Sequence, residues 1–184
     1  MHRSHVKLAG FSARWLLALM ALVLTVPLAA VRAQDTTGMG PDQLFLRHTL
    51  QEHVGATLVV HGALHRPGTF PSKADAQKID SRLDDEIDRL RVALKNLYND
   101  NFAPQPRDLA HAIADSLAKL GGPKYDYTFR NWFIDYDQLQ VQVIDKTMPK
   151  LTNATVKALA QKMRAAASSE ITMLKAVVNL PVPS

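Results

Sequence analysis

Cysteine is absent from this 184-residue chain. Its absence excludes disulfides, thiolate metal sites, iron–sulfur clusters, covalent c-type haem and a cysteine nucleophile. The sequence also lacks a glycine-rich phosphate loop, a G-x-S-x-G motif and an H-E-x-x-H motif, so nothing indicates a nucleotide site, a serine hydrolase or a zinc protease. The composition is otherwise that of an ordinary globular protein, with 47% hydrophobic and 21% charged residues.

The first 33 residues have the pattern of a targeting segment. Basic residues without any acid precede an uncharged run from Trp15 to Val31, and Val31-Arg32-Ala33 follows as a cleavage site before Gln34. This order is typical of a secretory signal peptide. The alternative is an uncleaved anchor, but a membrane-spanning helix needs about 20 apolar residues. We therefore expect export to the periplasm or to the outer membrane, and no membrane span after cleavage.

Removal of this segment changes the charge of the chain. The formal net charge is +5 at pH 7, and it falls to +1 when Arg3, Lys7, Arg14 and Arg32 are lost. No basic stripe then remains to indicate a nucleic-acid partner. The remaining 151 residues suffice for one domain, which we expect at 42–180 after a polar linker at 34–41.

Apolar residues recur at spacings of three and four in four long stretches, which predicts amphipathic helices. The first runs from Asp42 to His65, the second ends at Asn99, the third spans about 126–148, and the fourth starts near Thr152. On the second helix, a polar side that contains Arg82 is expected to face solvent. A shorter helix is predicted at 108–120, with Asp108 as its N-cap and Gly121-Gly122-Pro123 as its stop.

The two halves of the domain resemble each other when the sequence is shifted by 84 residues. Segments 41–96 and 125–180 share 11 identical residues in 56 positions, including Asp42 with Asp126 and Glu86 with Glu170. An internal repeat of two helical hairpins, 42–100 and 125–180, follows from this match. The predicted fold is all-α: a ferritin-like four-helix bundle, with 101–124 as the connection between the hairpins.

Short motifs in both halves support a family resemblance. The segment Tyr125-Asp126-Tyr127-Thr128-Phe129 resembles bacterial exported ferritin-like domains of unknown function, described as periplasmic or outer-membrane proteins. Gln51-Glu52-His53 resembles the His-bearing first helix of a sister family in the same group. The resemblance implies a secreted four-helix bundle, linked in some members to metal or stress, without a settled activity. The chain departs from the family pattern at Tyr136-Asp137 and at Glu170, where other members carry a histidine.

A di-iron centre in a four-helix bundle needs two Glu-x-x-His motifs. The chain offers only Glu86-x-x-Arg89 and Glu170-x-x-Met173, and arginine is not a metal ligand because it stays protonated. A di-iron oxidase is therefore the least favoured of the functions considered.

Histidines and carboxylates at matching positions of the two halves predict a different metal site. His53 corresponds to Asp137 and Glu86 to Glu170, and their convergence in the bundle would make a mixed His/carboxylate site for copper, zinc or iron. The alternative is a histidine hydrogen-bonded at the edge of the core and two solvated glutamates. Secondary metal ligands are the i, i+4 pairs His48 with Glu52 and His61 with His65, and thioethers for Cu(I) at Met148, Met163 and Met173.

The leading functional hypothesis is an exported protein that binds a transition metal in an envelope or stress role without catalysis. The alternative from another class is a structural or chaperone-like bundle that offers a helix face to an unidentified envelope protein. Inward-facing ligands would favour the first and an apolar outer groove the second.

Overall fold

The computed structural model describes residues 38–176 of the chain. The predicted signal peptide 1–33, most of the linker 34–41 and the end of the predicted domain at 177–180 lie outside the described residues. The helices are α2 (Pro41–Leu64), α3 (Lys73–Tyr98), α4 (Asp108–Ala118), α5 (Gly122–Thr147) and α6 (Ala154–Ala176), and one 3₁₀ turn, η2 (Met148–Lys150), follows α5.

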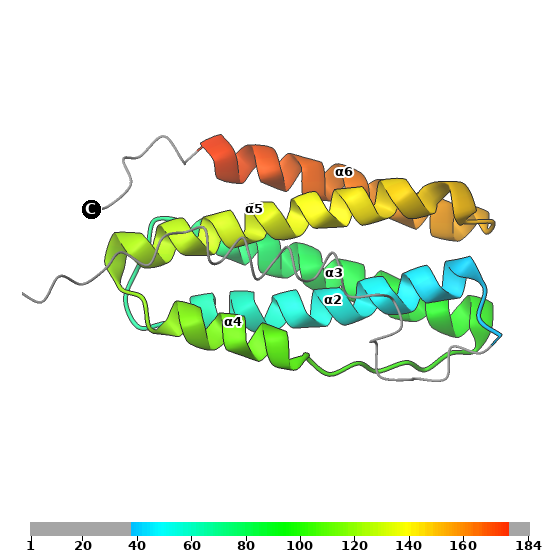
Figure 1. Cartoon of the computed structure of the whole chain (residues 1–184), viewed down its shortest axis with the longest axis horizontal. Coiled ribbons are helices and arrows are strands. Elements are labelled where there is room, and N and C mark those ends of the chain that lie inside the picture. Colours follow the sequence, from blue (N-terminus) through cyan, green and yellow to red (C-terminus); the bar gives the residue numbers. More distant parts are fainter. Residues whose placement is uncertain (1–37, 177–184) are drawn as a thin grey trace, which may run out of the picture. The chain divides into compact units, whose positions relative to one another are not determined.

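The four long helices form two antiparallel pairs, α2 with α3 and α5 with α6, and the short helix α4 lies along α2 (Figure 1). Helices α3 and α6 join the pairs into one bundle. The predicted all-α four-helix bundle of two hairpins with a short connecting helix is confirmed. Within residues 38–176, no helix is long and apolar enough to cross a membrane.

Two helix starts differ from the sequence prediction. Asp108 is the first helical residue of α4 rather than its N-cap, which is Arg107. Helix α5 begins at Gly122, four residues earlier than predicted, because Pro123 occupies the first turn. Proline is favoured there, since its fixed φ suits the helix and its missing N–H would have no intrahelical partner. The Gly-Gly-Pro segment therefore separates α4 from α5 and also begins α5.

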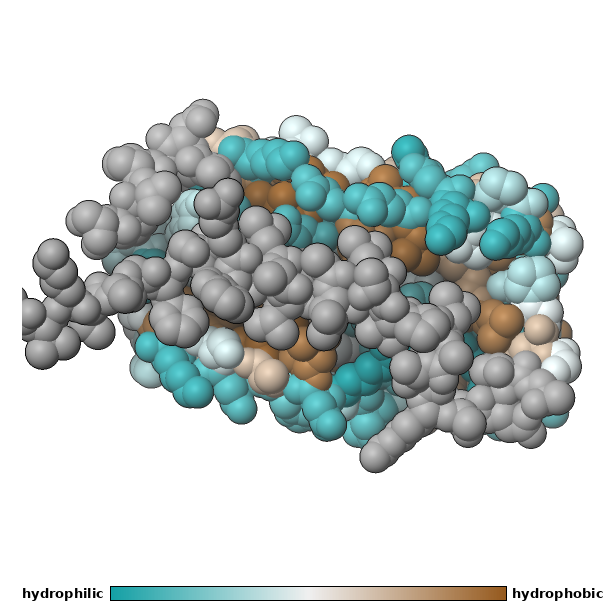
Figure 2. All heavy atoms as spheres, in the orientation of Figure 1, coloured by the Kyte–Doolittle hydropathy of each residue, from teal (hydrophilic) through white to brown (hydrophobic). Residues whose placement is uncertain are grey.

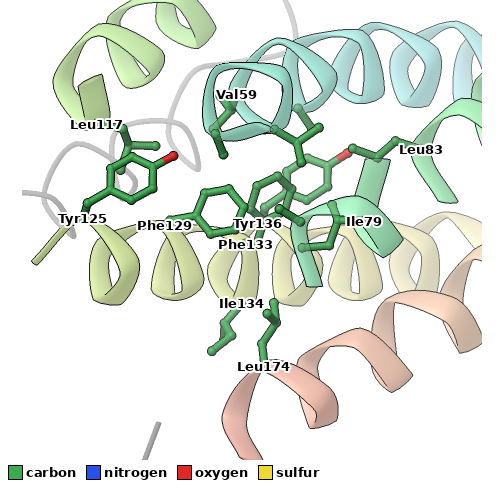
Figure 3. Packing of buried hydrophobic residues seen from close by; sticks show 14 of the residues in the cluster. Val59, Ile79, Leu83, Leu117, Tyr125, Phe129, Phe133, Ile134, Tyr136 and Leu174 are labelled. Atoms are coloured by element: carbon green, nitrogen blue, oxygen red, sulfur yellow. The ribbon is translucent and has the colours of Figure 1, made fainter. Parts of the chain in front are cut away.

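Two clusters of buried apolar side chains fill the bundle, and each long helix contributes to both. The aromatic cluster combines α5 side chains with apolar residues of the other helices; Figure 3 shows its α5 members Tyr125, Phe129, Phe133 and Tyr136. The aliphatic cluster is richest in leucine and includes Leu46, Leu90, Ile144 and Leu159. Hydrophilic side chains lie along the outer sides of the visible helices (Figure 2). Full burial of one such large apolar side chain contributes about 1.5–3 kcal/mol.

Two buried aspartates connect the hairpins at opposite ends. Asp42 of α2 accepts hydrogen bonds from the backbone N–H groups of Thr152 (3.0 Å) and Asn153 (3.2 Å), directly before α6. Asp126 of α5 accepts one from the backbone N–H of Ser72 (2.8 Å), directly before α3. Each aspartate thus binds orphan backbone donors at the start of a helix in the other hairpin. The sequence match pairs these two residues, although the repeat itself stays a prediction.

Candidate functional site

A polar layer separates the two apolar clusters in the middle of the bundle. On α2, the aliphatic cluster ends at Leu50, the aromatic cluster starts at Ala56, and buried His53 lies between them. The other three long helices pass from one cluster to the other in the same way. The buried polar residues at these crossings are Glu86 on α3, Asp137 and Gln140 on α5, and Glu170 on α6.

Arg82 of α3 is the centre of this layer. Its Nη1 donates to Glu86 Oε2 (2.9 Å), its Nε and Nη2 donate to the two oxygens of Glu170 (2.8 and 3.0 Å), and Nη2 also donates to Asp137 Oδ1 (3.0 Å). The bidentate contact with Glu170 is the strongest geometry available to an arginine. We call Arg82, His53, Glu86, Asp137 and Glu170 the arginine-centred network.

His53 extends the network from α3 to α2 and α5. Its Nε2 lies 2.8 Å from Glu86 Oε2, and its Nδ1 lies 2.8 Å from the Tyr136 hydroxyl and 3.1 Å from Gln140 Nε2. A neutral imidazole with its proton on Nε2 satisfies these contacts, because Nε2 then donates to the carboxylate and Nδ1 accepts. This ring therefore has no free nitrogen to offer a ligand.

Burial and neighbouring charges change the pKa values of two groups in the network, Asp137 and Arg82. Burial raises the pKa of Asp137 to about 9, with Glu170 and Glu86 adding to the rise and Arg82 opposing it. Burial disfavours a charged Arg82, but the surrounding carboxylates raise the pKa of its guanidinium above the ordinary value. At pH 7 the Asp137 side chain is therefore a neutral carboxylic acid, while the Arg82 guanidinium keeps its positive charge.

The four residues predicted as the main metal site come together, but around a guanidinium. Three of them bind Arg82 and the fourth binds Glu86. The alternative of solvated glutamates is wrong, since Glu86 and Glu170 are both buried. Arg82 was wrongly expected on the solvent side; its i, i+4 spacing to Glu86 was the available signal. Within residues 38–176, no group of three or more His, Asp or Glu side chains is placed to hold a metal ion.

The pair His48 and Glu52 lies on the outer side of α2. His48 is exposed, and the Glu52 carboxylate accepts a hydrogen bond from Arg107 Nη1 (2.8 Å). The carboxylate that would complete this metal pair thus has a cationic partner in the segment before α4. Among the predicted thioether ligands, Met163 is buried in the aliphatic cluster and Met173 packs against the aromatic one.

The pair His61 and His65 has a different environment at the end of α2. His65 Nδ1 lies 2.9 Å from the carbonyl oxygen of His61 and donates to it, so its Nε2 carries the lone pair. The two rings are 6.0 Å apart between centroids. His61 Nε2 lies 3.1 Å from Asp80 Oδ1 of α3. That oxygen is buried and has no hydrogen-bond partner among the described residues, because the imidazole is not oriented to donate to it.

Comparisons with known proteins identify a shared fold. No protein-family model matches the chain, and no curated protein matches it in sequence. Among solved structures, the chain is similar to CopM in the Cu(I)-bound form, with a TM-score of 0.61 and 20% sequence identity, over 73% of this chain and 93% of that chain. At this identity the similarity shows the helical-bundle fold alone, and the resemblance to exported ferritin-like domains stays a prediction.

Proposed function

We propose that the protein is an exported helical bundle that binds a transition metal ion at the end of α2, through His61 and His65. The observation that carries this proposal is the His65 ring, whose Nδ1 donates to a backbone carbonyl and leaves Nε2 as a ligand. Metal-binding histidines commonly donate their other ring N–H to a carbonyl or carboxylate oxygen, because this bond fixes the tautomer and the ring orientation.

The donor set fits the ion. His61 and His65 are one helical turn apart, and Asp80 offers a carboxylate oxygen 3.1 Å from His61 Nε2 that accepts no hydrogen bond from the described residues. Two imidazoles and a carboxylate suit copper and zinc. The His61 side chain is 48% exposed, so it can turn toward an ion that binds between the two rings. Copper is the first candidate, because CopM, which shares the fold, is known in a Cu(I)-bound form.

The arginine-centred network is the second candidate location. Its four predicted ligands converge, but a metal ion would have to displace the Arg82 guanidinium, which already provides their positive partner. Loss of a buried counter-charge costs several kcal/mol, about 3–5 kcal/mol in typical proteins. A metal ion bound by His61 and His65 displaces no buried cation, and this difference favours the site at the end of α2.

Isothermal titration of the purified protein with Cu(II) and Zn(II), and with Cu(I) under reducing conditions, tests the proposal. We expect one saturable site that is weakened about tenfold or more by His61→Ala or His65→Ala. His111→Ala is the matched control, because this exposed histidine of α4 has no histidine one turn away. Loss of binding in His53→Ala alone would place the ion in the network instead, and absence of saturable binding would refute metal binding altogether.

A further inference from the structure

A pocket of about 350 Å³ lies between the loop that joins α2 to α3 and the first turns of α5. Its walls are mostly apolar and come from Phe70, Pro71, Pro123 and Tyr125. Two arginines, Arg66 and Arg130, are its cationic members, and Asp126 is its acidic one. A largely apolar hollow with a few polar groups is the usual form of a small-molecule site.

Arg130 is a buried cation with too few acceptors. Its side chain is only 4% exposed, and its Nη2 forms an ion pair with Asp126 Oδ2 at 3.0 Å. Its Nε and Nη1 are buried and have no hydrogen-bond partner among the described residues. Asp126 is also engaged elsewhere, because it accepts the backbone N–H of Ser72. A guanidinium has five N–H donors, and buried donors without acceptors are costly, so an acceptor is missing here.

Two further features of the pocket favour a negative charge. Arg66 stacks on Tyr125, with its Cζ 4.1 Å from the ring centroid, and donates to the carbonyl oxygen of Leu120. Helix α5 starts at the pocket, and no side chain caps its first turn. The positive end of the helix dipole therefore adds to the two guanidinium groups, against the single carboxylate of Asp126.

From these features we infer that the pocket binds a small organic acid, whose carboxylate pairs with Arg130 and Arg66 and whose apolar part lies against the aromatic walls. The row of aromatic side chains along α5 ends at the pocket with Tyr125 (Figure 3). Phe70 meets the Tyr125 ring edge-on at a centroid distance of 5.3 Å. Aromatic faces and edges of this kind favour a flat apolar group. The site uses neither His61 nor His65 and is independent of the metal site proposed above.

The test uses phenylacetate, its neutral analogue 2-phenylethanol and inorganic phosphate, each titrated into the purified protein and followed by amide NMR shifts. We expect saturable phenylacetate binding that moves the amides of Thr69 and Gly122. Arg66→Gln should weaken binding about tenfold, since it removes a charge-assisted contact. Arg47→Gln should leave it unchanged; Arg47 also stacks on an aromatic ring, that of Phe102, and is not part of this pocket.

Three results would overturn the inference. If 2-phenylethanol binds as tightly as phenylacetate, the guanidinium groups do not recognise a carboxylate. Phosphate that binds as tightly would show that the aromatic walls contribute nothing to recognition. Absence of saturable phenylacetate binding would show that the unpartnered donors of Arg130 are simply tolerated by the fold. The Arg66 variant keeps the test valid even if Arg130→Gln fails to fold, because Arg66 is only partly buried.

Discussion

Two arginines lie inside the bundle, Arg82 and Arg130, and acceptors compensate their positive charges to different extents. Arg82 donates four hydrogen bonds to the carboxyl groups of three residues, and its side chain is 14% exposed. Arg130 is more deeply buried, yet among the described residues it has one carboxylate partner, and two of its nitrogen atoms have no partner. Both lie on helices that line the same aromatic cluster. The two arginines therefore differ in the number of their acceptors, and the more deeply buried one has fewer.

The comparison distinguishes a guanidinium that is bonded to several helices from one that has unpartnered donors. Around Arg82, acceptors from α3, α5 and α6 bind the guanidinium, so the network links three helices. Asp137 Oδ2 is its one side-chain oxygen that is buried without a hydrogen-bond partner among the described residues. Around Arg130, the only acceptor within residues 38–176 lies on the same helix, one turn earlier. A buried donor without a partner is either a cost to folding or a contact kept for a ligand.

The largest effect is expected from Arg82→Met, which keeps the length of the side chain and removes its charge. Glu86 and Glu170 would then remain buried without a cation, and we expect a loss of about 3–5 kcal/mol in the free energy of unfolding. Urea denaturation measures it. Arg89→Met is the control, because Arg89 pairs with Asp85 on the exposed side of the same helix and should give no detectable change. A loss below about 1 kcal/mol in Arg82→Met would contradict a structural role for the network.

The same variant provides a second test of the network. With the guanidinium removed, the carboxyl groups of Glu86, Asp137 and Glu170 surround the vacated position, with His53 bonded to Glu86 behind them. Carboxylate oxygens are ligands of Zn(II). We expect saturating Zn(II) to restore about 2–3 kcal/mol of stability to Arg82→Met by mass action. Both the variant and its parent should carry His61→Ala, so that the surface pair does not contribute. Equal stabilisation of variant and parent would show that the four residues do not form a latent metal site.

A smaller loss is expected from Arg130→Met. Only one ion pair disappears, and Asp126 keeps the backbone N–H of Ser72 as a partner. We expect a loss of about 1–3 kcal/mol, below that of Arg82→Met, by the same denaturation experiment. A loss larger than that of Arg82→Met would show that the number of acceptors does not measure what these arginines contribute.

A pH dependence of the stability also distinguishes the network. The pKa of Asp137 is about 9 in the folded protein, above the ordinary value of 3.8, so the folded state binds this proton more tightly. Its contribution to stability is complete below pH 3.8 and is lost as the pH rises toward 9. Asp137→Asn should remove this pH dependence. Between about pH 5 and pH 8, the free energy of unfolding of the variant should therefore rise relative to that of the wild type by about 1 kcal/mol or more. Parallel stability curves for the two proteins would contradict a neutral Asp137.

Much of the bundle could be predicted from the sequence, because helix periodicity is a local property. The apolar spacing of Ile79, Leu83, Ile87 and Leu90 fixes one buried face for α3, and all four are buried. Asp85 and Arg89, which are exposed and one turn apart, form a 2.7 Å hydrogen bond, as their i, i+4 spacing indicates. The predicted helix starts were less accurate. The start of α5 at Gly122 was missed because Gly-Gly-Pro can both end one helix and begin the next.

The candidate sites could be predicted only in part. The match between the two halves placed His53, Glu86, Asp137 and Glu170 at one level of the bundle, because helices of equal pattern and length carry equivalent residues to equal heights. It could not reveal that Arg82 occupies the space between them. Charged residues usually mark the solvated side of an amphipathic helix, and that general tendency produced the wrong expectation for Arg82.

The sequence by itself determined the helices, their pairing into two hairpins and the level of the polar residues, since these follow from periodicity, breakers and chain length. The tertiary structure alone decided which arginine is satisfied and which is not. A guanidinium's partners come from several helices, and the orientation of those helices about their own axes selects them. Arg82 reaches carboxylates on three helices and Arg130 on one, although each has an acid four residues away in the chain.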